Sequence, residues 1–259
     1  MAHSLSIADL FARAKGRPGA EIVLELLLTP TYAEFSRLVN KAIDLSLVTM
    51  AENPELRKDR SEDELTIELV NLLRQLTFEA SHEAKVGGHC DISVRGPNSY
   101  LWLGEAKKHN KGNPWLLQGF QQLNTRYSTG IGQHNEGALI IYLYKPNALK
   151  QMEAWKEHLQ NSIDQLVASA CPESALAFVS THPHDRTGLP YTVRHVPLSL
   201  YFKPKDKKKR GAKKGAKKAG KKISAKKAAR KTRSAKQPKP SKKQRTKKAP
   251  TKRKKRSSR

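Results

Sequence analysis

The sequence contains little cysteine and no long apolar run. Cys90 and Cys171 are the two cysteines among 259 residues, so we expect no disulfide framework and a reducing compartment such as the cytoplasm. The apolar run of residues 22–28 is interrupted by Glu25 and is far shorter than the roughly 20 residues that span a bilayer. Residues 1–13 do not have the pattern of a secretory signal. The sequence therefore predicts a cytoplasmic protein without membrane association.

Acidic residues are almost absent from the C-terminal part of the chain. Residues 203–259 contain 30 Lys and Arg and one acid, Asp206, which gives this segment a formal net charge of +29. Residues 1–202 contain 20 basic and 22 acidic residues, a net charge of −2. The formal net charge of +27 thus belongs to a polycationic tail. The near-neutral body is long enough to bury a full hydrophobic core.

The tail also lacks aromatic residues, since none follows Phe202. A segment with so little apolar surface and so much like charge is expected to be disordered when free. It should bind the phosphates of DNA or RNA without reading sequence. Its first basic run consists of Lys207, Lys208, Lys209 and Arg210. The tail resembles the lysine- and alanine-rich tails of linker histones and bacterial histone-like proteins, which implies condensation or anchoring of nucleic acid. We therefore expect the protein to be associated with the nucleoid. The alternatives are a solubilising or targeting tail, or attraction to an anionic membrane.

The first part of the body is expected to be helical. Residues 1–58 carry apolar side chains near helical spacing, with breaks expected at residues 29–31 and 53–54, each of which contains a proline. Ser61 then opens an amphipathic helix and forms a capping-box pattern with Glu64. The leucine stripe of this helix consists of Leu65, Leu69, Leu72, Leu73 and Leu76. We divide the chain into an N-terminal helical region (1–58), a second domain (59–202) and the basic tail (203–259).

After the leucine stripe, the periodicity of the sequence changes from helical to strand-like. The patterns predict strands over residues 78–86, 90–94, 100–106, 137–144, 175–180 and 191–202, and helices over 114–127 and 148–170. This order predicts an α/β sandwich in which the first three strands form a meander and helices cover both faces of the sheet.

Two acids and a lysine stand at the ends of two expected strands. Residues two apart on a strand face the same side, so Glu105 and Lys107 should point together and Ala106 the opposite way. An antiparallel hairpin would bring Asp91 beside Glu105. Two neighbouring carboxylates require a cation, and hard oxygen ligands favour Mg²⁺, for which Mn²⁺ can substitute. Lys107 could then neutralise the charge that develops on a phosphate, or help to orient the attacking water.

These residues carry a resemblance to a known family. The segment Gly88-His-Cys-Asp91, followed by Gly104-Glu-Ala-Lys107, resembles the active-site signature of the PD-(D/E)xK nuclease superfamily. That superfamily includes restriction endonucleases, Holliday-junction resolvases and repair nucleases. The resemblance covers about residues 60–145 and implies a restriction-endonuclease-like core, with Asp91 and Glu105 as metal ligands and Lys107 as the catalytic lysine. The sequence departs from the pattern at Cys90, where the family often has proline.

Many members of the superfamily use a further acid from the first helix. Glu64 and Glu68 share one edge of the leucine stripe, and we favour either of them as a third metal ligand. Glu62 lies nearer the stripe but at the start of the helix, where the helix can fray. The alternative is that all three are solvated surface acids, with Glu64 serving as part of the cap.

The helix expected after the motif supplies candidates for substrate binding. The resemblance extends to this helix, because several branches of the family carry a glutamine before a tyrosine there. Gln122 or Gln121 could orient the scissile phosphate, and Arg126 could contact the nucleic-acid backbone. The alternative is an ordinary amphipathic helix whose glutamines lie at the surface.

The sequence therefore predicts a Mg²⁺-dependent endonuclease that acts on DNA and is held to nucleic acid by its tail. One alternative is a non-catalytic, nucleoid-associated protein that uses a nuclease-like body as a binding module. Another is a nuclease that cleaves RNA. Defence against foreign DNA and DNA repair are both compatible with the sequence, as is a homodimer or a larger assembly serving either role.

Overall fold

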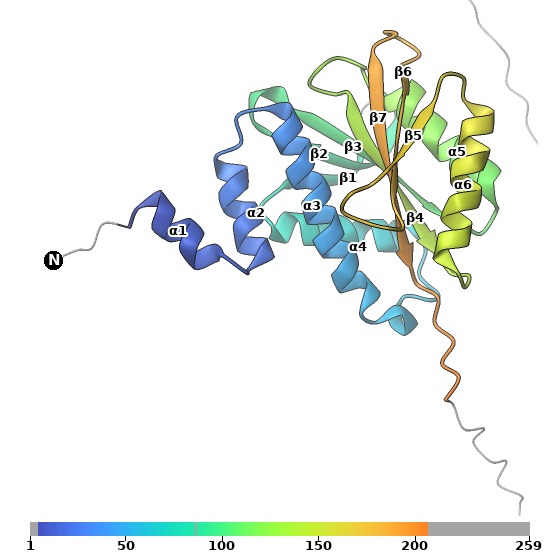
Figure 1. Cartoon of the computed structure of the whole chain (residues 1–259), viewed down its shortest axis with the longest axis horizontal. Coiled ribbons are helices and arrows are strands. Elements are labelled where there is room, and N and C mark those ends of the chain that lie inside the picture. Colours follow the sequence, from blue (N-terminus) through green and yellow to red (C-terminus); the bar gives the residue numbers. More distant parts are fainter. Residues whose placement is uncertain (1–4, 86, 207–259) are drawn as a thin grey trace, which may run out of the picture. The chain divides into compact units, whose positions relative to one another are not determined.

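The structure, a computed structural model, describes residues 5–85 and 87–206 (Figure 1). Lys207, Lys208, Lys209, Arg210 and the rest of the expected nucleic-acid tail lie outside the described residues. The described part is an α/β protein in which N-terminal helices precede an open, mixed sheet of seven strands. None of the helices in residues 5–85 and 87–206 is both long and apolar enough to cross a membrane.

Four α-helices precede the first strand, and polar caps define where three of them begin. The helices are α1 (Ile7–Ala14), α2 (Pro18–Leu27), α3 (Tyr32–Ala51) and α4 (Glu62–Gln75), with a short 3₁₀ turn, η1 (Pro54–Leu56), before α4. Ser6 and Ser61 form capping boxes with the third residue of the helices that follow them, and the Thr31 hydroxyl caps α3. The expected breaks at residues 29–31 and 53–54 and the helix that begins after Ser61 are confirmed.

The sheet has the strand order β1-β2-β3-β4-β7-β6-β5. The strands are β1 (Glu79–Lys85), β2 (His89–Arg95), β3 (Leu101–Lys108), β4 (Glu136–Leu143), β5 (Val167–Ala170), β6 (Phe178–Pro183) and β7 (Pro190–Ser199). β1, β2 and β3 pair antiparallel in sequence order, which confirms the expected meander. β3, β4 and β7 are parallel neighbours, and β6 and β5 complete the sheet with antiparallel pairing.

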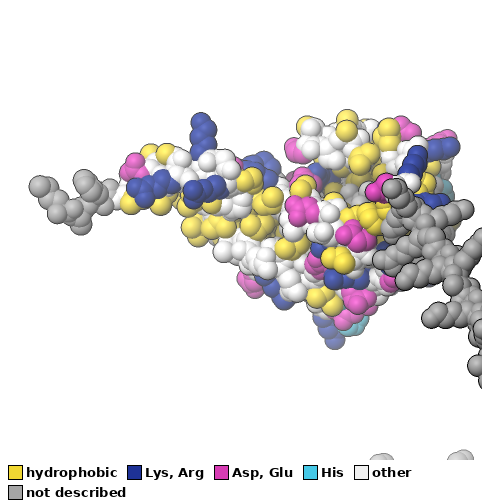
Figure 2. All heavy atoms as spheres, turned by 90° about the horizontal axis from the view of Figure 1, so that it is seen from below, with side chains coloured by type: hydrophobic (Ala, Val, Ile, Leu, Met, Phe, Trp, Pro, Cys, Tyr) yellow, Lys and Arg dark blue, Asp and Glu magenta, His cyan; other side chains and the backbone are white. Residues whose placement is uncertain are grey.

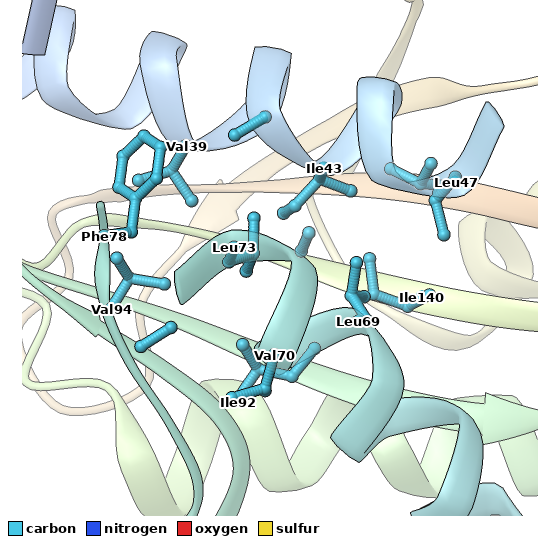
Figure 3. Packing of buried hydrophobic residues seen from close by; sticks show 14 of the residues in the cluster. Val39, Ile43, Leu47, Leu69, Val70, Leu73, Phe78, Ile92, Val94 and Ile140 are labelled. Atoms are coloured by element: carbon cyan, nitrogen blue, oxygen red, sulfur yellow. The ribbon is translucent and has the colours of Figure 1, made fainter. Parts of the chain in front are cut away.

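Helices cover both faces of the sheet, as expected. Val39, Ile43 and Leu47 of α3 point toward Leu69 and Leu73 of α4 over one face (Figure 3). The opposite face is covered by α5 (Asn113–Gln122) and α6 (Ala148–Ser162), which bury a second hydrophobic cluster against β3, β4 and β7. Because α3 shares the first hydrophobic cluster with the sheet, the residues on either side of the boundary that we set at residue 58 contribute to one core. That boundary therefore divides the chain along the sequence only.

Two of the expected helices end earlier than their sequence patterns indicate. The pattern predicts a helix over residues 148–170, but α6 ends at Ser162 and residues 167–170 form the edge strand β5, which pairs with β6. The apolar spacing of Ile163, Leu166 and Val167 continues the helical period. Ile163 and Leu166 pack beside the core from the turn after α6, whereas Val167 on β5 is exposed. The helix expected over 114–127 ends at Gln122 and widens into the π-helical turn η3 (Leu123–Tyr127).

A histidine is completely buried under the α6 face of the sheet. The Trp155 Nε1–H group, which can only donate, lies 3.1 Å from His195 Nδ1, and the His195 Nε2 atom lies 2.8 Å from the Ser180 hydroxyl. His195 Nδ1 therefore accepts and Nε2 carries the proton, so the ring is held neutral. Burial lowers the pKa of His195 to about 3.

The buried neutral histidine predicts a loss of stability in mild acid. The folded-state pKa of His195 lies below the unfolded value of about 6.5, so its stabilisation is complete above that pH and is lost as the pH falls toward 3. We expect His195→Gln to flatten the pH dependence of the free energy of unfolding by about 1.4 kcal/mol per pH unit between about pH 6 and pH 4. Urea denaturation measures this slope. His89→Gln, at an exposed histidine, is the matched control, and equal slopes in the two variants would contradict the prediction.

Candidate functional site

β2 and β3 separate at one end, and the carboxylate of Asp91 fills the opening. Backbone pairing between the two strands reaches Ile92 and Gly104 and goes no further toward Asp91, whereas the pairing of β1 with β2 continues to His89. The Asp91 Oδ2 atom accepts a hydrogen bond from the Ala106 N–H group at 2.9 Å. A side-chain carboxylate thus replaces the missing backbone acceptor, and this bond fixes Asp91 beside the end of β3.

Glu105 and Lys107 point from β3 toward α5. The Lys107 Nζ atom donates to Glu105 Oε1 at 2.5 Å and lies 3.5 Å from Asp91 Oδ2. Both side chains are buried, with exposed fractions of 1% for Glu105 and 6% for Lys107. Ala106 faces the opposite cluster, so the alternation expected from the sequence is confirmed. The structure therefore brings Asp91, Glu105 and Lys107 together.

A third acid reaches the same place from the start of α4. The Glu62 Oε1 atom lies 3.6 Å from Lys107 Nζ, and Glu62 Oε2 accepts the Lys108 N–H group at 2.6 Å. Glu62 is the first residue of α4, directly after the Ser61 cap. The cap therefore fixes the helix start beside the end of β3. We name Glu62, Asp91, Glu105 and Lys107 the acid–lysine cluster.

The structure brings neither of the two glutamates that we favoured from the sequence to this cluster. Glu64 is exposed and accepts the Ser61 N–H group at 2.7 Å as part of the capping box. Glu68 is held by Arg57 at 2.6 Å and by Arg60 at 2.7 Å. The leucine stripe indicates which side of α4 faces the sheet, whereas the cluster lies at the N-terminal end of the helix. Glu62 therefore replaces Glu64 and Glu68 as the acid of α4 that lies beside Asp91 and Glu105. In the sequence, its position directly after the Ser61 cap could have indicated this.

The cluster holds more negative than positive charge. Burial raises the pKa of Glu105 to about 8, and the neighbouring Asp91 carboxylate acts in the same direction, against the opposing effect of Lys107. Burial opposes the charged form of Lys107, but the carboxylates of Glu105 and Asp91 outweigh it and raise the Lys107 pKa. The Glu105 Oε2 atom is buried without a hydrogen-bond partner. These features favour an additional cation.

The donor set fits a hard divalent cation. Three carboxylates supply oxygen ligands of the kind that Mg²⁺ and Mn²⁺ prefer. Asp91 and Glu105 would hold the ion, with Glu62 beside them. In residues 5–85 and 87–206, no three acidic, histidine or cysteine side chains are already arranged as ligands around one point. The ammonium group of Lys107 lies among the carboxylates of the cluster, so binding of the ion requires Lys107 to leave Glu105.

The candidate substrate-binding residues of α5 and η3 line a separate polar hollow of about 330 Å³. Gln121, Gln122 and Arg126 lie there together, and none of the residues of the acid–lysine cluster lines the hollow. The Gln122 Oε1 atom is buried without a hydrogen-bond partner, so this glutamine is not an ordinary surface residue. The remaining lining residues are Gln118, Asn124, Thr125, Ile163 and Asp185.

An aromatic side chain that our sequence analysis did not single out lies beside the cluster. The centre of the Trp115 ring is 5.5 Å from Lys107 Nζ and 4.0 Å from Lys111 Nζ. Trp115 is half-buried, whereas Trp102 and Trp155 are fully buried. The spacing of Lys111 and Trp115 across the start of α5 was the signal that could have indicated this pair.

Comparison with known proteins adds no family or function. No protein-family model, curated protein or solved structure matches the chain.

The absence of a side chain at Gly119 allows α5 to approach the cluster closely. A Cβ atom at Gly119 would lie 2.8 Å from Lys107 Cγ and 3.4 Å from Glu105 Cγ. Replacing a helical glycine by alanine normally stabilises a protein by about 0.5–1 kcal/mol. We expect Gly119→Ala instead to lower the free energy of unfolding by about 1–3 kcal/mol, because Lys107 must move.

Chemical denaturation tests this expectation, with Gly132→Ala as the matched control. A Cβ atom at Gly132 meets no other atom within 4 Å, so that variant should stay within about 0.5 kcal/mol of the wild type. A Gly119→Ala protein as stable as the wild type would show that α5 does not constrain Lys107.

Proposed function

We propose that the protein is a metal-dependent nuclease that hydrolyses phosphodiester bonds in DNA. The observation that carries this proposal is the convergence of Asp91, Glu105 and Lys107, from two strands that separate at one end. The resemblance of these residues to the PD-(D/E)xK signature supports it. So does the chain order of one helix, a three-strand meander, a second helix and a fourth strand, which fits a restriction-endonuclease-like core.

Each residue of the cluster has a distinct task in this proposal. Asp91 and Glu105 hold the cation, and Glu62 adds a third carboxylate at its edge. A bound Mg²⁺ ion supplies Lewis-acid polarisation of the phosphate and lowers the pKa of a coordinated water. Lys107 contributes a positive charge that stabilises the negative charge developing on the phosphate oxygens. Its packing against Gly119 limits where that charge can lie.

The face of the body that Figure 2 shows carries no single continuous basic patch. Acidic, basic and hydrophobic side chains are interspersed over the described face in Figure 2, in agreement with the net charge of −2 for residues 1–202. In our proposal, the basic tail supplies the attraction to nucleic acid and the body supplies the chemistry. A tethered substrate has a raised effective concentration at the cluster without any added sequence preference.

The central prediction concerns cleavage of supercoiled and linear DNA. We expect nicking or cutting in the presence of Mg²⁺ or Mn²⁺ and none with EDTA. Asp91→Ala, Lys107→Ala and Glu62→Gln should each lower the rate by about 100-fold or more, because each removes a charged group from the reacting phosphate or its cation. Gel electrophoresis of the plasmid products measures the rate.

Glu64→Gln is the matched control, since it changes an acid only two residues from Glu62 that belongs to the cap. It should cleave at the wild-type rate. Cleavage that is equal in the wild type and in all the cluster variants would indicate a contaminant and refute the catalytic assignment. A structured RNA in a parallel reaction tests the alternative substrate, and binding without cleavage of either nucleic acid would favour the non-catalytic alternative.

Trp115 provides a measurement of nucleic-acid binding that is independent of cleavage. Because the other two tryptophans are fully buried, quenching by a bound strand should come from Trp115. Exposed bases stack on aromatic rings, so a single-stranded oligothymidylate should quench the emission of the wild type and not that of Trp115→Leu. Fluorescence anisotropy of a labelled strand confirms that both proteins bind. Equal quenching in the two proteins would exclude Trp115 from the contact surface.

The tail has its own test. Removal of residues 203–259 should weaken DNA binding and reduce its dependence on salt, because each phosphate contact that is lost releases one fewer counterion. The slope of the logarithm of affinity against the logarithm of salt concentration measures this. An unchanged slope would show that the tail does not anchor the protein to DNA.

A further inference from the structure

Lys108 is the last residue of β3 and directly follows Lys107 of the acid–lysine cluster. Alternation along the strand places Lys108 on the same face as Ala106, whose side chain belongs to the hydrophobic cluster shared with α3 and α4. The two consecutive lysines therefore lie on opposite faces of the sheet. Lys108 is half-buried, so its environment is not that of a fully solvated surface lysine.

Lys108 binds the chain on both sides of the helix cap Ser61. Its N–H group donates to Glu62 Oε2 at 2.6 Å, and its Nζ atom donates to the Arg60 carbonyl oxygen at 2.5 Å. Ser61 lies between these two residues and caps α4. One residue of β3 thus fixes both the backbone that enters α4 and the carboxylate of the first residue of that helix.

A tyrosine directly after β4 supports Lys108. The centre of the Tyr144 ring lies 4.6 Å from Lys108 Nζ, which is a cation–π contact. The Tyr144 hydroxyl donates to the Arg57 carbonyl oxygen at 2.9 Å. Residues 57–61 connect η1 to α4, and we call them the cap loop. Lys108 and Tyr144 therefore fix the cap loop to the sheet at two of its carbonyl groups.

Two arginines fix the other side of the cap loop to α4 itself. Arg57 and Arg60 pair with Glu68 at 2.6 Å and 2.7 Å. The Arg57 side chain is 10% exposed and that of Glu68 is 23% exposed, so this contact is partly shielded from water. The cap loop is thus held between the sheet and α4, and Glu68 serves as its anchor on the helix.

Glu62 needs such support because it is the first residue of its helix. Helix ends fray, and the first N–H groups of a helix have no partner within it. The Glu62 side chain is 24% exposed, so burial alone does not fix it. A free glutamate loses rotamer entropy when it is held beside a cation. A carboxylate that is already held loses less on binding, which raises the affinity for the ion.

We propose that Lys108 is a positioning residue of the metal site and acts by holding Glu62 beside Asp91 and Glu105. This inference rests on the metal site of the proposed function. Groups that orient metal ligands without touching the ion typically contribute about 10–100-fold to metal affinity or activity. The two lysines then have different tasks, since Lys107 supplies charge at the phosphate and Lys108 holds a ligand.

The test is a double-mutant cycle on the affinity for Mn²⁺, measured by calorimetry on the full chain without nucleic acid. Lys108→Met removes the ammonium group and keeps an unbranched side chain. It should weaken Mn²⁺ binding about tenfold or more. In a Glu62→Gln background the same change should weaken binding by less than about twofold, because the group through which Lys108 acts is already altered.

Two further variants complete the cycle. Lys108→Arg should recover most of the affinity, because a guanidinium group also donates to carbonyl oxygens and stacks on aromatic rings. Lys150→Met is the matched control, at an exposed lysine of α6, and should bind Mn²⁺ as the wild type does. Chemical denaturation verifies that each variant is folded under the conditions of the titration.

Amide exchange gives a second readout that needs no metal. The rate at which the amide hydrogen of residue 108 exchanges with solvent reports its hydrogen bond to Glu62. That rate should rise in Lys108→Met and in Glu62→Gln and stay unchanged in Lys150→Met. An unchanged rate in Lys108→Met would show that the ammonium group does not hold Glu62 in place and would overturn the proposal.

The outcomes separate this proposal from the nuclease proposal. Wild-type Mn²⁺ affinity in Lys108→Met, or an equal loss in both backgrounds, would overturn the positioning role and leave the nuclease proposal standing. Coupled losses of Mn²⁺ affinity without any DNA cleavage would support the positioning role and count against the nuclease. A wild-type protein that binds no Mn²⁺ would refute the metal site and both proposals with it.

Discussion

Burial of Glu105 beside Asp91 is the electrostatic constraint on which the rest of the site depends. Burial of Glu105 raises its pKa to about 8, and repulsion by the neighbouring Asp91 carboxylate acts in the same direction. Two groups stabilise the negative charge of these acids. The Lys107 ammonium group lies among them, and the Ala106 N–H group donates a hydrogen bond to Asp91. Lys107 supplies one positive charge against three acidic side chains. The excess explains why these residues suit a divalent cation.

The fold places this constraint at a point where strand pairing fails. β2 and β3 pair from Arg95 to Ile92 and separate at Asp91. α4 begins beside the same end of β3, and α5 packs there as well. Residues from α4, β2, β3 and α5 thus lie together at this point. None of them interrupts the hydrophobic clusters on the two faces of the sheet.

Sequence patterns predicted what depends on local periodicity. The helix after Ser61, the meander and the common face of Glu105 and Lys107 follow from capping and from the alternation of strands. The end of α6 was predicted wrongly, because an edge strand continued the apolar period of the helix by coincidence of spacing. Glu62 and Trp115 were not assigned to the site, because the stripe of a helix gives its buried side but not which strand end lies near its first turn.

The most direct test of the account is the position of Mn²⁺ in crystals of the protein, located by anomalous scattering. The account predicts a peak coordinated by Asp91 and Glu105, close to Glu62, with the Lys107 ammonium group moved away from Glu105. Glu62→Gln should lower the occupancy of that peak, and Glu64→Gln should leave it unchanged. A cluster without Mn²⁺, in which Lys107 still contacts Glu105 at saturating metal, would contradict the proposal that these residues form a metal-dependent catalytic site.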